Sequence, residues 1–249
     1  MTSAPVRSGT RGGAGRADGP GAGNDAAGVI VFLARVLPEH MEFASAREAM
    51  VDRLEAGGYA ERPATADALR AVPRHEFVPA ERRGGAYDDR PLPIGDGQTI
   101  SAPHMVAVMS DLLAPDPDDD VLEVGTGCGY HAAVTAELVD DGTVSSVEYR
   151  PALADRARET LDSLGYDRVR VRVGDGHEGW PRHAPYDAAY LTCATPSVPD
   201  AVVDQVREGG VVVAPVGERR QRLVTLRVRA DGIDREDHGG VRFVQMRGG

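Results

Sequence analysis

Three glycines at alternate positions, followed at a fixed distance by an acidic residue, are the part of this chain best suited to binding a ligand. Residues 119–148 read DDVLEVGTGCGYHAAVTAELVDDGTVSSVE. Glycines 125, 127 and 129 let the backbone turn sharply and approach a ligand with no Cβ in the way. Glu148 lies 19 residues beyond Gly129, where a carboxylate at a strand end can accept hydrogen bonds from both ribose hydroxyls. This order predicts a nucleoside site, although a structural glycine turn remains the plainer alternative.

The glycine spacing separates two kinds of cofactor. A dinucleotide fingerprint would need a third small residue at position 130, which is Tyr130. Glu123, just before the loop, suits a cationic or amino-bearing ligand rather than a phosphate. The motif resembles the first motif of class I S-adenosylmethionine-dependent methyltransferases. That resemblance implies S-adenosylmethionine as the cofactor, contacted by Glu123, Gly125, Gly127 and Gly129, and it makes an NAD-dependent dehydrogenase a weak alternative.

The elements that must position this loop alternate between strand and helix from residue 119 onward. Strands are predicted near 120–124, 143–148, 168–173, 187–192 and 210–216, and helices near 130–139, 151–164 and 199–207. Such alternation predicts an α/β fold with a doubly wound, mostly parallel, Rossmann-like sheet. After Gly217 the pattern changes to period two around an Asp231-Gly232 turn, which predicts a C-terminal antiparallel hairpin.

N-terminal helices are expected to precede the sheet. Ser45-Ala-Arg-Glu48 is a capping box that predicts a helix from about 46 to Gly57, and a second helix is predicted near 65–72. Residues 73–100 predict a long irregular loop. Ser101 is predicted as the N-cap of the next helix, because Pro103 is tolerated in a first helical turn.

The chain divides into three predicted parts. Residues 1–40, rich in Gly, Ala and Arg at their start, form a disordered tail or result from a misassigned start codon. Residues 41–100 form N-terminal helices and a substrate-side loop. Residues 101–249 form the domain that binds S-adenosylmethionine.

The charge composition limits the partners. All 28 basic residues are arginine, and 39 acidic residues give a net charge of −11. An acidic, lysine-free surface favours a protein from a salt-rich cytoplasm, whereas a GC-rich genome would explain the missing lysine alone. Because phosphate neutralisation needs a basic face, no nucleic-acid partner is expected.

The remaining composition predicts a cytoplasmic monomer. Two distant cysteines, Cys128 and Cys193, give no disulfide framework, and the histidines show no spacing typical of metal ligands. No apolar run approaches the ~20 residues that a membrane span requires. We therefore expect no metal and no membrane association.

Two segments carry a more specific resemblance. Residues 72–105 contain VPRHEFVP and AYDDRPLPIGDGQTISAPHM, and later blocks read GDG, TCATPSVP and GGVVVAPVG before the ending DHGGVRFV. Together with EVGTGCGY, these blocks resemble the protein-L-isoaspartate O-methyltransferases from about Met41 to the C-terminus. Cys193 and Thr195 depart from the family pattern, since alanines are frequent there.

The resemblance implies a repair enzyme that methylates the free carboxylate of isoaspartyl residues in damaged proteins and peptides. It implies that Ser101 is the active-site residue, and that Glu148 and the Asp175-Gly176 pair hold ribose and adenine. It also places three residues at the substrate: Thr99, Ile100 and Ala194.

Residue chemistry supports a positioning role for Ser101. A carboxylate with a pKa of about 4 is already ionised at neutral pH, so this nucleophile needs no general base. A hydroxyl near a helix N-terminus can instead orient the carboxylate. The plainer alternatives are that Ser101 only caps a helix, that Glu148 is an exposed strand end, and that Asp175 forms a turn.

Two competing functions remain open from the sequence. Another class I methyltransferase, acting on a small molecule or on tRNA, would explain the glycine loop but not the QTISAPHM block. A non-catalytic module that recognises isoaspartyl sites or the cofactor would be consistent with the altered segment around Cys193.

If the acidic surface is an adaptation to salt, the protein should be more stable in molar KCl than in dilute buffer, because salt relieves repulsion between carboxylates. Thermal unfolding followed by circular dichroism over a KCl series measures this. A melting temperature that does not change with salt would contradict the interpretation.

Overall fold

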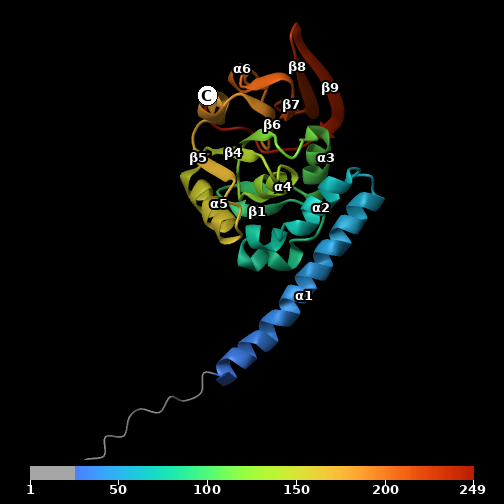
Figure 1. The fold of residues 1–249 in the computed structure, drawn as a ribbon, viewed down its shortest axis with the longest axis vertical. Helices are drawn as coiled ribbons and strands as arrows, with labels where there is room; N and C mark the ends of the chain where they lie inside the picture. The colour runs from blue at the N-terminus through green and yellow to red at the C-terminus, as the bar shows by residue number, and fades with distance from the viewer. Residues whose placement is uncertain (1–25) are drawn as a thin grey trace, which may run out of the picture. The chain divides into compact units, whose positions relative to one another are not determined.

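A seven-stranded sheet forms the centre of the compact unit of residues 41–249 (Figure 1). The computed structural model describes residues 26–249, and the side chains from Met41 onward. The strand order is β5-β4-β3-β6-β7-β8-β9, parallel as far as β7 and antiparallel beyond it. The strands are β3 Asp120–Val124, β4 Thr143–Glu148, β5 Val169–Val173, β6 Tyr186–Leu191, β7 Val206–Val216, β8 Gln221–Arg229 and β9 Gly232–Val241.

Helices and a small hairpin complete the described chain. The α-helices are α1 Ala26–Ala56, α2 Pro63–Ala71, α3 Pro103–Leu113, α4 Tyr130–Leu138, α5 Pro151–Ser163 and α6 Asp200–Val203. Four short 3₁₀ helices are η1 Arg74–Phe77, η2 Ala80–Gly85, η3 Gly176–Glu178 and η4 Pro181–His183. The hairpin consists of β1 Leu92–Gly95 and β2 Gln98–Ile100.

The central strands are buried because helices cover both faces of a parallel sheet. Leu122, Val124 and Ala189 lie in one apolar cluster, and Val121 lies in another on the opposite face of the sheet. A third cluster joins residues of 50–100 to α4 and α5. The N-terminal segments from Met41 onward therefore share the core of the sheet domain.

The topology places a crevice at the end of β3. This strand pairs with β4 on one side and with β6 on the other, so successive crossovers leave it in opposite directions. Ligands of open α/β sheets bind at such a switch point, beyond the carboxyl ends of the strands. The glycine loop follows β3 directly.

The predicted fold class is confirmed: the sheet is Rossmann-like and mostly parallel, with C-terminal antiparallel strands and N-terminal helices. The helix predicted over 199–207 was too long. It ends at Val203, because the backbone carbonyl of Gln205 accepts a hydrogen bond from the amide of Tyr186 at 2.7 Å and the chain has already joined the sheet.

Two N-terminal predictions were also wrong. Helix α1 already runs through Ser45, so the capping box does not start it, although its end at Ala56 agrees with the prediction. Residues 73–100 are more ordered than expected, since they contain η1, η2 and the β1–β2 hairpin. Those elements are too short to produce a periodic signal. Of the tail predicted over 1–40, residues 1–25 lie outside the described residues.

None of the described helices is long and apolar enough to span a bilayer. Among the described residues, no three His, Cys, Asp or Glu side chains gather in a group that could hold a metal ion.

Candidate active site

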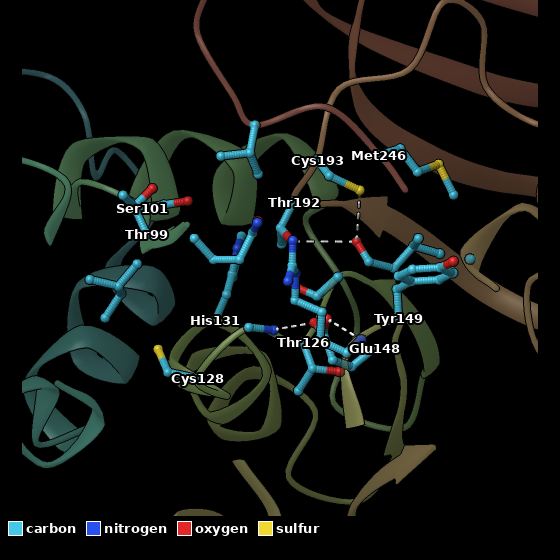
Figure 2. Close-up of a pocket in the computed structure, with 18 of the residues that line it drawn as sticks. Thr99, Ser101, Thr126, Cys128, His131, Glu148, Tyr149, Thr192, Cys193 and Met246 are labelled. Atoms are coloured by element: carbon cyan, nitrogen blue, oxygen red, sulfur yellow. Dashed lines mark hydrogen bonds between the residues drawn. The ribbon is translucent and has the colours of Figure 1, made fainter. Parts of the chain in front are cut away.

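A pocket opens at the carboxyl end of β3, where the switch point of the sheet predicts a ligand (Figure 2). Seven of the residues expected to contact a ligand line it: Thr99, Ile100, Ser101, Gly125, Gly127, Glu148 and Gly176. We call this cavity the donor pocket. Figure 2 shows Ser101 and Thr99 on one side of it and Tyr149 and Met246 on the other. The pocket is therefore wide enough to separate two ends of a ligand.

The glycine loop is packed too closely for a side chain at Gly125. Gly125 has φ +101°, and a Cβ there would lie 2.4 Å from the hydroxyl oxygen of Thr192. The Gly125 amide donates to the carbonyl of Val147 at 2.8 Å. The loop is thus held against the end of β4, and its backbone forms the pocket wall.

Glu148 ties this loop to β4. One carboxylate oxygen accepts a hydrogen bond from the amide of Gly127 at 2.9 Å, and the other accepts from the amide of Arg150 at 2.9 Å. Each oxygen keeps a further lone pair that can accept from a ligand hydroxyl. A carboxylate on the Gly127 amide also occupies a donor that a phosphate would need. The loop therefore suits an uncharged ribose rather than a pyrophosphate.

Glu123 lies inside the protein and does not line the pocket. Its side chain is fully buried. It accepts a hydrogen bond from the Tyr190 hydroxyl at 2.9 Å and is also hydrogen-bonded to the Ser146 hydroxyl. Ser146 in turn contacts the hydroxyl of Thr126 at 2.5 Å, and Thr126 does line the pocket. Burial raises the pKa of Glu123 to about 8. It is therefore protonated at neutral pH and supplies no counter-charge to a cation.

His131 reaches the donor pocket from α4. Burial lowers the pKa of its imidazole to about 3, so the ring is neutral. Its Nδ1 atom is buried without a hydrogen-bond partner among the described residues. An unpaired buried polar atom of this kind is costly to stability.

Three other expected contact residues lie next to the pocket but not on its wall. Gly129, with φ +90°, is the N-cap residue of α4, and a Cβ there would lie 3.1 Å from the Leu161 side chain. The Asp175 carboxylate accepts from the amides of His177 at 2.9 Å and Gly249 at 2.8 Å. Ala194 is fully buried.

The backbone of Ala194 nevertheless shapes the pocket. Its amide donates to the carbonyl of Val244 and its carbonyl accepts from the amide of Met246, both at 2.8 Å. These bonds hold residues 244–247 against the pocket, where all four line the wall. No local sequence signal marks this segment, because only the fold brings it to β6.

Ser101 does not cap a helix, contrary to the prediction. Helix α3 begins at Pro103 with Ala102 as its N-cap. The backbone carbonyl of Ser101 accepts a hydrogen bond from the Arg74 guanidinium at 2.7 Å, while its hydroxyl bonds to none of the described residues. The hydroxyl is therefore available to a ligand in the pocket.

Arg74 is a buried residue that holds the backbone of the pocket wall at Ser101. It is fully buried, donates to the carbonyl of Ala86 at 2.8 Å as well as to Ser101, and lies 4.7 Å above the ring of Tyr130. It makes no ion pair with any described carboxylate. A buried unpaired cation is costly, and here its field favours an anion beside Ser101.

Both cysteines of the chain, Cys128 and Cys193, line the pocket wall. Burial raises the pKa of Cys128 to about 11 and that of Cys193 to about 12. Both therefore stay as thiols at neutral pH. Because the thiolate is the nucleophilic form of cysteine, neither side chain competes with a substrate for an electrophile held in the pocket.

Several lining residues besides residues 244–247 were not among the predicted site residues. Tyr149 follows Glu148 directly and is 51% exposed, so its aromatic ring is available to a flat ligand group. Thr192 and Cys193 follow β6, the strand next to β3. Their position after a strand that neighbours the glycine loop was the signal that could have identified them.

Comparison with known proteins agrees with this geometry. A family model described as protein-L-isoaspartate(D-aspartate) O-methyltransferase matches residues 45–249. A protein-L-isoaspartate O-methyltransferase of Methanopyrus kandleri is 53% identical over 210 residues, covering 83% of this chain and 93% of the relative. A second such protein, of Archaeoglobus fulgidus, is 50% identical over 84% of this chain and 95% of the relative.

Solved structures share the fold. A protein-L-isoaspartate O-methyltransferase structure superposes with a TM-score of 0.75 at 30% identity, over 81% of this chain and 66% of that chain. A Plasmodium falciparum structure with S-adenosyl-L-homocysteine bound gives a TM-score of 0.73 at 21% identity, over 81% of this chain and 98% of that chain. At that lower identity the likeness shows the fold alone.

The fold and the pocket define a Rossmann-like methyltransferase that uses S-adenosylmethionine. The chain belongs to the protein-L-isoaspartate(D-aspartate) O-methyltransferase family. It methylates the free carboxylate of isoaspartyl residues in damaged proteins, which starts their repair. Neither a small-molecule methyltransferase nor a non-catalytic module remains as an alternative.

Replacing Glu123 with Gln should change how stability depends on pH. The folded protein keeps a proton on Glu123 up to about pH 8, whereas the unfolded chain releases it near pH 4.5. Because the unfolded state then binds fewer protons, stability falls as pH rises between these values, by roughly 1.4 kcal/mol per unit. Glu123→Gln cannot titrate, so its free energy of unfolding should lack this decline.

Urea unfolding of both proteins from pH 5 to pH 8 measures the difference. The wild-type stability should fall relative to that of the variant across this range. Two curves that run parallel would show that Glu123 is ionised in the folded protein.

Proposed function

We propose that the pocket holds S-adenosylmethionine with its adenosine end at Glu148 and its methyl group toward Ser101. In this arrangement Glu148 accepts from the ribose hydroxyls, and Gly176 with the Asp175 backbone borders the adenine. Gly125 and Gly127 form the wall against which the cofactor lies. Residues 41–100 then provide the substrate side and residues 101–249 the cofactor side. The separation of Ser101 from Tyr149 across the pocket supports this direction (Figure 2).

The residues present fit this cofactor. The carboxylate of Glu148 faces the pocket with free lone pairs, and the glycine loop carries no basic side chain that would favour a phosphate. When bound, S-adenosylmethionine supplies an electrophilic methyl group on a positively charged sulfur. In our proposal the protein contributes binding, orientation and the exclusion of water.

The acceptor requires positioning rather than a base. The α-carboxylate of an isoaspartyl residue is ionised at neutral pH, so no proton has to be removed before it attacks. It must instead lose part of its water shell and point an oxygen at the methyl carbon, and such orientation supplies as much as ~7–11 kcal/mol of barrier lowering. The unbonded Ser101 hydroxyl can donate to one carboxylate oxygen and so direct the other.

Arg74, buried behind Ser101, supports the orientation of the substrate carboxylate by the Ser101 hydroxyl. Its guanidinium fixes the Ser101 carbonyl, which limits where the hydroxyl can point. Its unpaired positive charge lowers the cost of bringing the substrate anion out of water. Ser101 in this proposal contacts the substrate, whereas Arg74 is a positioning residue. Thr99 and Ile100 line the same wall beside Ser101, and Ala194 acts through its backbone.

We further propose that the protein acts as a cytoplasmic monomer without a nucleic-acid partner. The net charge of −11 opposes general binding to phosphates, and both cysteines are free thiols, as in a reducing compartment. Sedimentation equilibrium at micromolar concentration would reveal a dimer if one forms.

Ser101→Ala should lower kcat for an isoaspartyl peptide by about 10²-fold, because the carboxylate loses its orienting hydrogen bond. The Kd for S-adenosylhomocysteine should stay close to that of the wild type, since cofactor binding depends on Glu148 and the glycine loop. Methyl incorporation from labelled cofactor and calorimetric titration measure the two quantities.

Ser163→Ala is the matched control, because Ser163 is an exposed serine at the end of α5. It lines neither the donor pocket nor the second cavity that adjoins this pocket at Ser101. It should leave both constants unchanged. Equal losses of turnover and cofactor affinity in Ser101→Ala would assign Ser101 to cofactor binding instead.

A further inference from the structure

A second cavity, of about 1030 Å³, adjoins the donor pocket at Ser101. The two cavities share four lining residues: Thr99, Ser101, Thr192 and Val244. The second cavity, which we call the arginine groove, extends from Ser101 between the start of α3, the turn before β8 and the segment after β9. A polypeptide whose isoaspartyl residue reaches Ser101 must continue away from that residue, and this groove offers it a path.

The groove is positively charged although the chain is acidic. Its described lining contains four arginines and one histidine but no aspartate or glutamate, whereas the whole chain has 39 acidic residues against 28 basic ones. One of these arginines is neutralised locally, since Arg222 pairs with Asp237 at 2.8 Å, and the His104 ring is hydrogen-bonded to Asp89 at 2.8 Å.

Three arginines remain available. Arg219, Arg220 and Arg242 are exposed and form no ion pair with any residue that the structure describes. They come from two segments that are distant in sequence, the turn between β7 and β8 and the first residue after β9. Their common location therefore depends on the fold and not on a local run of charge.

Two glutamines fix this location. The buried side chain of Gln221 accepts from the amide of Phe243 at 2.6 Å and donates to its carbonyl at 3.1 Å. Gln245 donates to the carbonyl of Glu218 at 3.0 Å. These bonds join the segment that carries Arg242 to the turn that carries Arg219 and Arg220. The three positive charges are thus held along one wall that ends at the active-site serine.

We propose that the arginine groove binds acidic residues flanking the isoaspartyl site, so that this methyltransferase prefers acidic segments of damaged proteins. The inference rests on the proposed role of Ser101, since it takes the groove as the continuation of that acceptor site. An acidic protein repels acidic partners at long range, and a local strip of unpaired cations reverses this repulsion where the substrate must lie. Met105 and Phe243 add apolar surface for the peptide between the charges.

Two isoaspartyl peptides of equal length test the proposal, one with Glu at two positions on each side of the isoaspartyl residue and one with Gln at the same positions. At low ionic strength the wild-type KM for the Glu peptide should be about 3- to 10-fold lower, because each exposed charge pair contributes modestly. The ratio of the two KM values should shrink in about 0.5 M KCl, where exposed charges are screened.

Arg219→Gln/Arg220→Gln should bring this ratio close to one. The matched control is Arg227→Gln/Arg235→Gln, which removes two exposed arginines from the adjoining β8–β9 hairpin, outside both cavities. This control should keep the wild-type ratio. Circular dichroism verifies that both variants fold.

Equal KM values for the two peptides in the wild type would overturn the groove proposal while leaving the role of Ser101 intact. The same loss of ratio in both double variants would also overturn it, because the effect would then reflect net charge alone. If a single-stranded oligonucleotide displaces the Glu peptide at lower concentration than a second Glu peptide does, the groove binds nucleic acid instead. If neither isoaspartyl peptide accepts a methyl group, the proposed function itself fails.

Discussion

The contact between the Glu148 carboxylate and the amide of Gly127 is the interaction on which the cofactor side of this molecule depends. It joins the two strands that meet at the switch point, since Gly127 follows β3 and Glu148 ends β4. It also decides what the loop can bind, because a backbone amide that already serves a carboxylate is not available to a phosphate. We infer that this Rossmann-like sheet holds a nucleoside with free ribose hydroxyls rather than a dinucleotide.

The acceptor side depends on a different constraint, the buried guanidinium of Arg74. Water cannot stabilise this charge, and two backbone carbonyls and the face of Tyr130 do so only in part, since Nη1 has no partner among the described residues. One of those carbonyls belongs to Ser101, which connects the 3₁₀ segment η1 to the active site. The VPRHEFVP block therefore contributes to the active site through the Arg74 side chain, which holds the backbone of Ser101, although no side chain of the block lines the donor pocket or the arginine groove.

Much of the fold could be predicted because its signals are local. The glycine loop, the strand–helix alternation and the Asp231-Gly232 turn each depend on a few neighbouring residues, and the sheet agrees with them. Elements whose ends depend on distant partners were predicted poorly. Helix α6 stops early because the carbonyl of Gln205 pairs with Tyr186, and no neighbour of Gln205 in sequence encodes that contact.

The same distinction applies to the site. Gly125 and Glu148 could be located from their spacing, whereas the direction of the Glu123 side chain depends on Ser146 and Tyr190 on two other strands. Whether the Ser101 hydroxyl caps α3 depends on one residue of register at the helix start. Residues 244–247 reach the pocket only through backbone bonds to Ala194.

These constraints together explain how a reactive methyl donor can be held beside several nucleophilic atoms. The two pocket thiols are kept protonated by burial, His131 is neutral, and Glu123 holds its own proton inside the sheet. Glu148 remains as a pocket carboxylate, and amide hydrogen bonds already occupy both of its oxygens. In the proposed arrangement the isoaspartyl carboxylate is the group best able to approach the methyl carbon at neutral pH, because it enters from the Ser101 side with an oxygen that no backbone amide restrains. Selectivity in this arrangement follows from the protonation and hydrogen bonding of the wall as much as from recognition of the substrate.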